Sequence, residues 1–320
     1  MMFFSELTEE HIRINRDLER ISDALHRETA ERVRRFHGSM RWKKANGSEY
    51  LFRISGATRK GLGRRSPETE KIYNAFVEGK QRAQEQVKSL SASLKTTIGF
   101  AKAAGLGRVP ALTATILRRL DENELLGYIK IVGTVALFAY EAIADIRFSN
   151  DIIATSGIDF LVDARRRSSR RTMSEFMKGI DPSFRPVPGK TYCMVNQGGF
   201  FANLIERTPI AAWQKPKDIA DPDEIEGLEW LAESKSIRTL IVDVNGVPAP
   251  IIVPDPRIWM LHKMWLSERP TRESSRAVRD RYQADALFDL FGRYLPNHPI
   301  DQEFRQNLPA GLRPHAAKAM

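Results

Sequence analysis

The chain has 320 residues, and its 50 Lys or Arg against 40 Asp or Glu give a formal net charge of +10 at pH 7. A hydrophobic content of 42% is enough for a packed core and argues against a disordered chain. No apolar run reaches the roughly 18 residues of a membrane-spanning helix, and the start lacks the pattern of a secretory signal. The single cysteine, Cys193, excludes an internal disulfide framework. We therefore expect a cytoplasmic protein without a membrane partner.

The basic charge makes polyanions such as RNA the first partner class to consider. A generally basic, solvated surface is the alternative. Distribution is more informative than the total: residues 41–65 hold eight Lys or Arg against the single acid Glu49. Two further arginine clusters occur at 165–171 and 269–281, the latter diluted by acids. Sequence does not show whether these clusters meet in one groove, and it leaves the oligomeric state open.

The first third of the chain predicts helices around one hairpin. Apolar residues at helical spacing indicate a helix over 6–36. Asn46-Gly47 favours a two-residue turn, which predicts a β-hairpin over 40–54, followed by a loop to Arg65. Ser66 and Pro67 then form a start signal for a long helix, and Pro110 opens another that runs to about residue 120.

The hairpin mixes aromatic and basic residues, a combination that suits a nucleic-acid strand. Tyr50 and Phe52 lie on one face of their strand, and we expect them to pack inward. Trp42 and the neighbouring lysines stay open to either interpretation.

From residue 128 strands and helices alternate. The expected elements are a strand at 128–132, a helix from 135, a strand at 157–163, a helix at 172–180, strands at 192–196 and 200–206, a helix at 223–234, a hairpin around Asn245-Gly246, helices over 255–294 and a loose tail from 308. This order predicts an α+β fold with an α/β-like core: a small mixed β-sheet between helical N- and C-terminal regions. The expected division is 1–122 with the hairpin, a core over 123–254, and a helical region over 255–320.

Several kinds of chemistry lack support. The six histidines form no HxxxH pair and no Cys/His pairing, which leaves little support for zinc. No Gly-x-Ser-x-Gly elbow and no Walker loop occurs, and GLGRR at 61–65 is only a glycine-rich basic loop.

The informative segment is the strand, the turn Gly133-Thr134, the helix, and the strand with Asp159 and Asp163. A Gly-Thr turn that leads into a helix offers backbone N–H groups to a phosphate. Side chains alternate along a strand, so residues 159 and 163 share one face, where carboxylates are able to hold magnesium. The alternative is that both are ordinary polar residues at a strand end.

Residues 133–148 and 154–165 resemble a bacterial branch of the DNA polymerase β nucleotidyltransferase superfamily. Similar motifs at 41–53, 62–76 and 196–205 and from 253 onward extend the resemblance over about 40–295. The resemblance implies a nucleotidyltransferase core that binds a nucleoside triphosphate and transfers a nucleotidyl group to an RNA, protein or small-molecule acceptor. It also implies two metal ions, Mg²⁺ or Mn²⁺, held by an Asp-x-Asp pair and a third Asp.

Matched by position, Gly133 and Thr134 are the phosphate turn, and Asp159 is the second Asp of the pair, expected as catalytic residue and metal ligand. Gly157 stands where the first Asp is expected, Asn203 stands at the third as the other expected ligand, and Val135 replaces a usually polar position. Asp163 is the second expected catalytic residue. Asp163 or Asp243 is a candidate substitute for the lost ligands, although neither occupies a matched position. Lys263 and Arg276 are expected to contact phosphate.

Loss of two of the three carboxylates removes two negative charges that hard cations need. We therefore expect Mg²⁺ or Mn²⁺ to be held weakly, with reduced or lost metal-dependent activity. The alternative is an inactive relative that binds nucleic acid or a partner protein through its basic clusters.

Overall fold

The computed structural model of the protein describes residues 3–163, 173–207 and 227–318. The chain forms two compact units, Arg13–Ala104 and Met1–Ile12 with Gly105–Met320. The arginine cluster at 165–171 and the first part of the helix predicted over 223–234 lie outside the described residues. Each unit is described here by itself.

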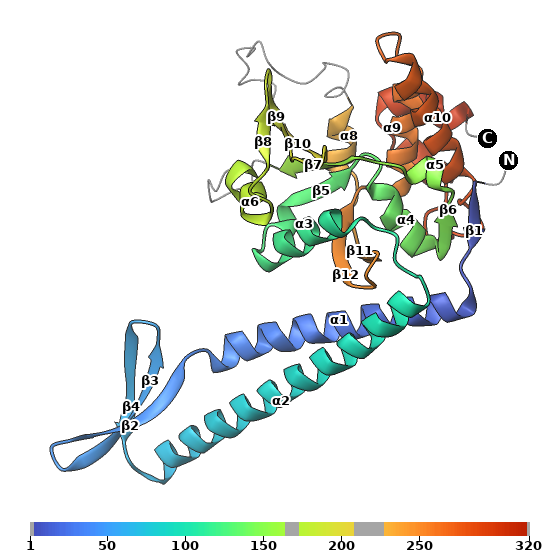
Figure 1. Ribbon diagram of the computed structural model, residues 1–320. Helices are drawn as coiled ribbons and strands as arrows, with labels where there is room; N and C mark the ends of the chain where they lie inside the picture. Colours follow the sequence, from blue (N-terminus) through green and yellow to red (C-terminus); the bar gives the residue numbers. More distant parts are fainter. Residues whose placement is uncertain (1–2, 164–172, 208–226, 319–320) are drawn as a thin grey trace. The chain divides into compact units, whose positions relative to one another are not determined.

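The smaller unit combines two long helices with a three-stranded antiparallel sheet (Figure 1). Its elements are α1 (Glu9–Phe36), whose first turn belongs to the other unit, β2 (Ser39–Ala45), β3 (Ser48–Ser55), β4 (Thr58–Arg64) and α2 (Pro67–Ala103). The predicted helix, hairpin and N-cap are confirmed: the Ser66 hydroxyl accepts from Thr69 N, and Ser66 N donates to the Thr69 hydroxyl at 2.9 Å. The loop predicted up to Arg65 is wrong, because this stretch pairs with β3 as a third strand. Gly61 and Gly63 made this stretch resemble a loop in sequence, because glycine is uncommon in strands.

The expected inward packing of Tyr50 and Phe52 is also wrong. Leu51 has no exposed surface and pairs with Trp42, whose ring lies 5.8 Å from that of Tyr73 on α2. This face of the sheet is therefore the one that packs on α2. Tyr50 and Phe52 point to the opposite face because side chains alternate along β3. Side-chain alternation correctly predicted that the two aromatic residues share one face of the strand. Which face is covered depends on the position of α2.

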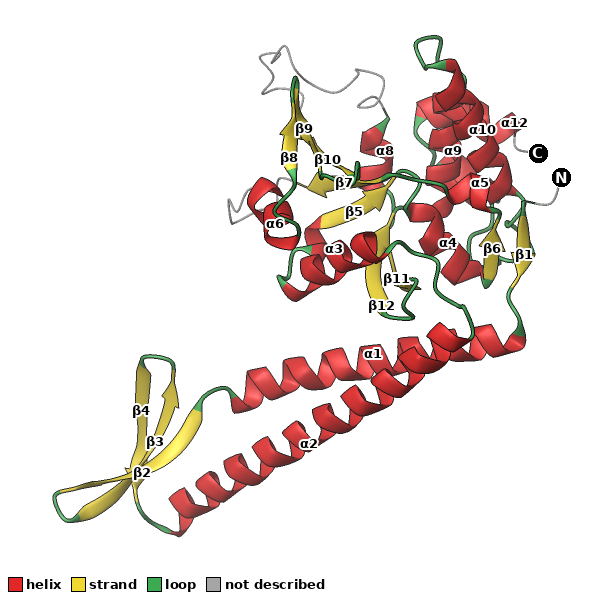
Figure 2. Ribbon diagram, viewed as in Figure 1, coloured by secondary structure: helices red, strands yellow, loops and turns green. Residues whose placement is uncertain are grey.

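The larger unit is built around a five-stranded sheet in the order β5-β7-β10-β9-β8. The strands are β5 (Ile129–Val132), β7 (Gly157–Asp163), β10 (Phe201–Arg207), β9 (Lys190–Val195) and β8 (Arg185–Val187). Only β7 and β10 are parallel, and the other neighbours are antiparallel, so the sheet is mixed. The predicted α+β class with a small mixed sheet is confirmed (Figure 2).

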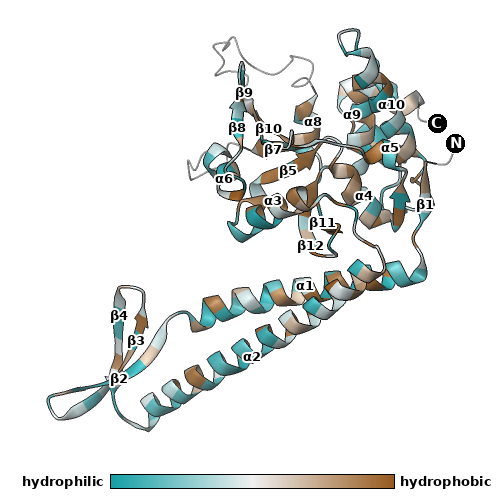
Figure 3. Cartoon of the chain, in the orientation of Figure 1, coloured by the Kyte–Doolittle hydropathy of each residue, from teal (hydrophilic) through white to brown (hydrophobic). Residues whose placement is uncertain are grey.

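Helices and two small sheets surround this central sheet. They are β1 (Phe4–Glu6) paired with β6 (Ile146–Phe148), the hairpin β11 (Ile237–Val242) and β12 (Pro248–Val253), and the helices α3 (Ala111–Glu122), α4 (Ala136–Ala144), α5 (Asn150–Ile153), α6 (Met173–Ile180) and α8 (Leu228–Glu233), with a short turn η1 (Leu126–Tyr128). Figure 3 shows apolar residues concentrated on the central strands and α4, which form one continuous core.

The C-terminal region is α9 (Pro256–Ser267), α10 (Ser274–Phe288), α11 (Gln302–Gln306), η4 (Ala310–Leu312) and α12 (Arg313–Lys318). Helices over 255–294 are confirmed, with a break between α9 and α10. The loose tail is wrong: Leu312 and Ala316 are buried in the core, which holds these short helices in place.

The two units do not follow the predicted division. Val109 N donates a hydrogen bond to Val242 O, and Val109 O accepts one from Val244 N, at the β11–β12 hairpin. The larger unit therefore already includes the segment before α3. Residues 255–320 join the same unit because α9 packs into its core: the rings of Tyr140 and Trp259 lie 5.7 Å apart, and the Tyr140 hydroxyl donates to Pro254 O at 3.1 Å.

His262 in α9 gives this core a defined pH dependence. The imidazole is buried, stacked on Trp265 at 5.9 Å between ring centroids, and burial with the nearby Lys263 cation lowers its pKa to about 3. The folded pKa lies below the ordinary value near 6.5, so between these two values the unfolded state binds a proton that the folded state does not. The stability that the neutral ring contributes is therefore complete above pH 6.5 and is lost as the pH falls toward 3.

We expect the free energy of unfolding of the wild type, relative to His262→Leu, to fall by about 1.4 kcal/mol per pH unit below pH 6. Urea titrations of both proteins at pH 7, 6 and 5, followed by near-ultraviolet circular dichroism, measure this difference. A difference that stays constant across the three pH values contradicts the assignment.

Candidate functional site

A cleft of about 930 Å³ lies in the larger unit, at one end of the central sheet. It is lined by the turn between β5 and α4, by β7, β9 and β10, and by α9, α10 and the segment that joins them. The predicted phosphate turn, the strand carboxylate and the basic helices thus border one space.

The turn Gly133-Thr134 adopts a conformation that requires glycine. Gly133 has a φ of 64°, and a Cβ at this position would lie only 2.0 Å from an oxygen of Asp159. The absence of a side chain lets the Asp159 carboxylate lie directly against the turn. Any other residue at 133 is strained in its backbone and collides with that carboxylate.

The hydroxyl of Thr134 is held by α10. It accepts hydrogen bonds from Gln283 Nε2 at 3.1 Å and from Arg279 Nη2 at 3.3 Å. Gln283 is buried and also donates to Ile152 O at 2.8 Å, while Arg279 also donates to Ala154 O. With both acceptor positions used, the Thr134 hydroxyl has its hydrogen to offer to an acceptor in the cleft, such as a phosphate oxygen.

Asp159 and Asn203 are direct neighbours on the two parallel strands. Their Cα atoms pair in the register of β7 and β10, and Asn203 Nδ2 donates to Asp159 Oδ1 at 2.8 Å. A carboxylate only accepts here, which fixes the orientation of the amide. Asn203 therefore gives Asp159 a hydrogen bond where an aspartate would place a second negative charge.

Gly157 has no room for the aspartate that the superfamily pattern expects. A Cβ on Gly157 would lie 2.7 Å from the carbonyl oxygen of Phe201 and 3.0 Å from its Cβ. Because the first of these contacts is with backbone, a side chain at 157 requires β7 and β10 to shift.

A buried ion network forms the opposite side of the cleft. Asp280 on α10 accepts from Lys263 Nζ at 2.5 Å and from Arg272 Nη2 at 2.7 Å. Burial raises the pKa of the Asp280 carboxyl, but the two cations outweigh it and hold the pKa below its usual value. Lys263 thus lines the cleft with its charge matched by Asp280, and it anchors the basic wall.

Two exposed arginines, Arg276 and Arg279, complete this wall at the start of α10. Arg276 lies 3.3 Å from Glu273, and both side chains are more than half exposed. Such an ion pair contributes little to stability, so the guanidinium exchanges it for an anionic ligand at small cost.

The structure brings together most of the residues proposed from the sequence. The cleft is lined by Gly133, Thr134, Asp159, Asn203, Lys263 and Arg276. Asp163 ends β7, and its side chain lies outside the described part of the structure. Asp243 as a substitute ligand is wrong: it is buried in the β11–β12 hairpin, where it accepts from Arg118 at 3.1 Å and from the turn amides of Asn245 and Val247.

Sequence reasoning assigned no role to the residues that hold the turn and balance the wall: Arg272, Arg279, Asp280 and Gln283. A signal existed, since positions 276, 279, 280 and 283 recur at the three- and four-residue spacing of one helix face. The resemblance predicted phosphate contacts from Lys263 and Arg276, but the sequence did not indicate that Arg279 and Gln283 bond to the Thr134 hydroxyl.

The donor set does not fit a pair of divalent metal ions. Within residues 3–163, 173–207 and 227–318, no group of three His, Cys, Asp or Glu side chains is placed to hold a metal. At the expected position Asp159 is the single carboxylate, its neighbour is an amide, and the facing wall is cationic. Hard cations need several anionic oxygens, and this arrangement supplies too few.

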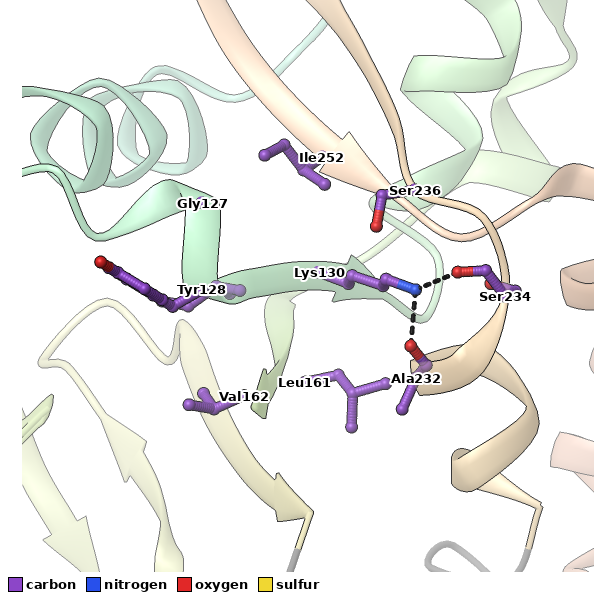
Figure 4. A pocket seen from close by; sticks show the side chains of 10 residues that line it. Gly127, Tyr128, Lys130, Leu161, Val162, Ala232, Ser234, Ser236 and Ile252 are labelled. Atoms are coloured by element: carbon purple, nitrogen blue, oxygen red, sulfur yellow. Dashed lines mark hydrogen bonds between the residues drawn. The ribbon is translucent and has the colours of Figure 1, made fainter. Parts of the chain in front are cut away.

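A second, smaller cavity of about 250 Å³ lies between the start of β5 and the residues that follow α8 (Figure 4). The Lys130 ammonium lies at the C-terminal end of α8 and donates to the carbonyl oxygens of Leu231, Ala232 and Ser234. This contact ends a short helix and stabilises its last carbonyls, which makes Lys130 a structural residue.

Asn203→Asp tests the charge argument for the strand pair. The substitution removes one hydrogen bond and places two carboxylates side by side. We therefore expect the free energy of unfolding in EDTA to fall by about 1–3 kcal/mol. Millimolar Mn²⁺ should restore part of the loss, measured as the melting temperature. The control Asn203→Leu loses the hydrogen bond without adding charge and should not respond to Mn²⁺. A variant Asn203→Asp as stable as the wild type in EDTA contradicts the argument.

A family model described as nucleotidyltransferase matches residues 111–309, which is more than half of the chain. The match covers the central sheet, the cleft and helices α9 and α10. No curated protein and no solved structure matches the chain. Among the described residues, no helix is long and apolar enough to cross a bilayer. The sequence match and the geometry of the cleft agree, and the chain belongs to the nucleotidyltransferase family.

Proposed function

We propose that the cleft binds a nucleoside triphosphate, with its phosphates held by the turn Gly133-Thr134 and by the basic wall of α9 and α10. The observation that carries this proposal is the hydrogen-bonded link from Arg279 and Gln283 to the Thr134 hydroxyl. The link joins the turn to the cationic helix face, so both contact the same ligand.

The charges that line the cleft support this ligand class. Five basic side chains face three acidic ones, and two of the acids, Asp280 and Glu273, are paired with arginine or lysine. A cleft with this excess attracts a polyanion. Lys190, Arg276 and Arg279 are the exposed members. We assign Arg276 and Arg279, on the same helix, to phosphate contact.

The general activity of the family is nucleotidyl transfer, and we propose an RNA, protein or small-molecule hydroxyl as the acceptor. In this reaction the acceptor oxygen bonds to the α-phosphorus, the bond to the β-phosphate oxygen breaks, and pyrophosphate leaves. The arginines neutralise the charge on the leaving pyrophosphate, and Asp159 accepts the acceptor's proton. The resemblance to the polymerase β superfamily supports this assignment of Asp159, while Gly157 and Asn203 make the reaction slower than in a chain with all three carboxylates.

A nucleotide-binding relative without transfer activity is the second candidate. It is favoured by the same two departures, since the contact between position 157 and Phe201 backbone opposes the return of a metal ligand. Pyrophosphate release measured with each triphosphate and Mn²⁺ separates the two candidates. Release that depends on Asp159 supports transfer, and binding without release supports the silent relative.

Isothermal titration with the four nucleoside triphosphates, in EDTA and in Mg²⁺, tests the binding itself. We expect binding to at least one nucleotide in EDTA, about tenfold weaker in Arg276→Ala, because a charge-assisted hydrogen bond is worth about 1.5–3 kcal/mol. Asp159→Ala should bind equally or more tightly in EDTA, since a negative charge beside the phosphates is removed.

Arg281→Ala is the matched control, because Arg281 is an exposed arginine on the same helix, pairs with Asp285 and does not line the cleft. Failure of all four nucleotides to bind in either buffer refutes the proposal. Equal weakening by Arg276→Ala and Arg281→Ala reduces it to general attraction by basic charge.

A further inference from the structure

The sheet of the smaller unit has an uncovered face of distinctive composition. Pairing across β2, β3 and β4 places one set of side chains on the side opposite α2, called here the outer face: Arg41, Lys43, Tyr50, Phe52, Ile54, Arg59 and Arg64. Its four cationic side chains are exposed, and its two aromatic rings are half-buried.

The one acidic residue of this sheet points the other way. Glu49 shares the α2 side with Leu51, and its carboxylate lies 2.5 Å from Arg65. The outer face therefore carries four positive charges with no acid among them. It is a concentrated site for a polyanion, distinct from a mixed solvated surface.

The aromatic rings give this face more than charge. Tyr50 and Phe52 are two residues apart on β3, so their side chains emerge side by side about 7 Å apart. Tyr50 pairs with Lys43 on β2 and with Arg64 on β4, so a basic residue lies on each neighbouring strand beside it.

Phe52 is already used as a stacking surface. The Arg59 guanidinium lies 3.7 Å from the centre of its ring, and opposite it β4 carries Gly61, which has no side chain to cover the ring. The guanidinium occupies one face of the ring, so a flat partner that stacks there has to displace Arg59 or lie over it. A nucleobase is such a partner.

We propose that the outer face binds single-stranded nucleic acid, with phosphates on the exposed cations and bases stacked on Tyr50 and Phe52. Base stacking needs unpaired bases, so the aromatic pair selects a single strand over a duplex, whose bases are already stacked. The proposal concerns residues far in sequence from the cleft and holds whether or not the cleft transfers a nucleotidyl group.

Fluorescence anisotropy with the full chain and a labelled single strand of about a dozen nucleotides, as RNA and as DNA, measures binding. We expect the double variant R41E and K43E to weaken binding at least tenfold at low salt and to flatten the dependence of affinity on salt, because fewer counterions are released. The control double variant K88E and K95E makes the same charge change at exposed positions of α2 and should weaken binding less than threefold.

Tyr50→Leu separates stacking from charge. It keeps apolar bulk on the sheet and leaves every cation in place, and we expect it to weaken single-strand binding about five- to a hundredfold with the salt dependence unchanged. A duplex of the same sequence should bind more weakly than the single strand and should not respond to Tyr50→Leu.

Two results overturn the proposal. One is absence of binding to either single strand at low salt. The other is equal affinity for single strand and duplex together with no effect of Tyr50→Leu, which would make the outer face a general polyanion surface. Circular dichroism of each variant confirms that the fold is retained.

Discussion

The hydrogen bond between Asn203 and Asp159 sets the chemistry of the cleft. Parallel pairing of β7 and β10 places the two side chains next to each other, and two carboxylates in that position repel unless a cation lies between them. The amide removes the repulsion with one N–H donor instead of a metal ion. Among the described side chains that line the cleft, Asp159 is the single carboxylate on a strand, and the remaining charge is mostly positive.

Protein groups hold the turn Gly133-Thr134, which we propose as the phosphate site. Gly133 lets Asp159 pack against the turn, and Gln283 and Arg279 fix the Thr134 hydroxyl from α10. Gln283 is fully buried, so its hydrogen bonds are protected from water and are costly to leave unmade. The geometry of the turn is therefore maintained by protein groups alone.

Local sequence patterns identified the strand with Asp159, the Gly-Thr turn and the hairpin at Asn46-Gly47, since each depends on residues within one turn or one strand. They did not identify what packs against what. Asp243 directly follows a strand and was therefore a candidate metal ligand. Its partner Arg118, however, lies more than a hundred residues earlier in the chain. The covered face of the β2–β4 sheet likewise depends on α2, so alternation paired Tyr50 with Phe52 correctly and still placed them on the wrong side.

The two basic surfaces differ in how their charges are balanced, and this difference bears on what each binds. In the cleft, Asp280 pairs with both Lys263 and Arg272, and the exposed Arg276 and Arg279 lie beside a fixed hydroxyl, an arrangement suited to one compact triphosphate. On the outer face no acid matches the cations, and aromatic rings lie between them, an arrangement suited to an extended strand with repeated phosphates and bases. Together the two proposals give the chain a site for a nucleotide and a separate site for a nucleic acid, which is the pair of ligands that nucleotidyl transfer to an RNA end requires.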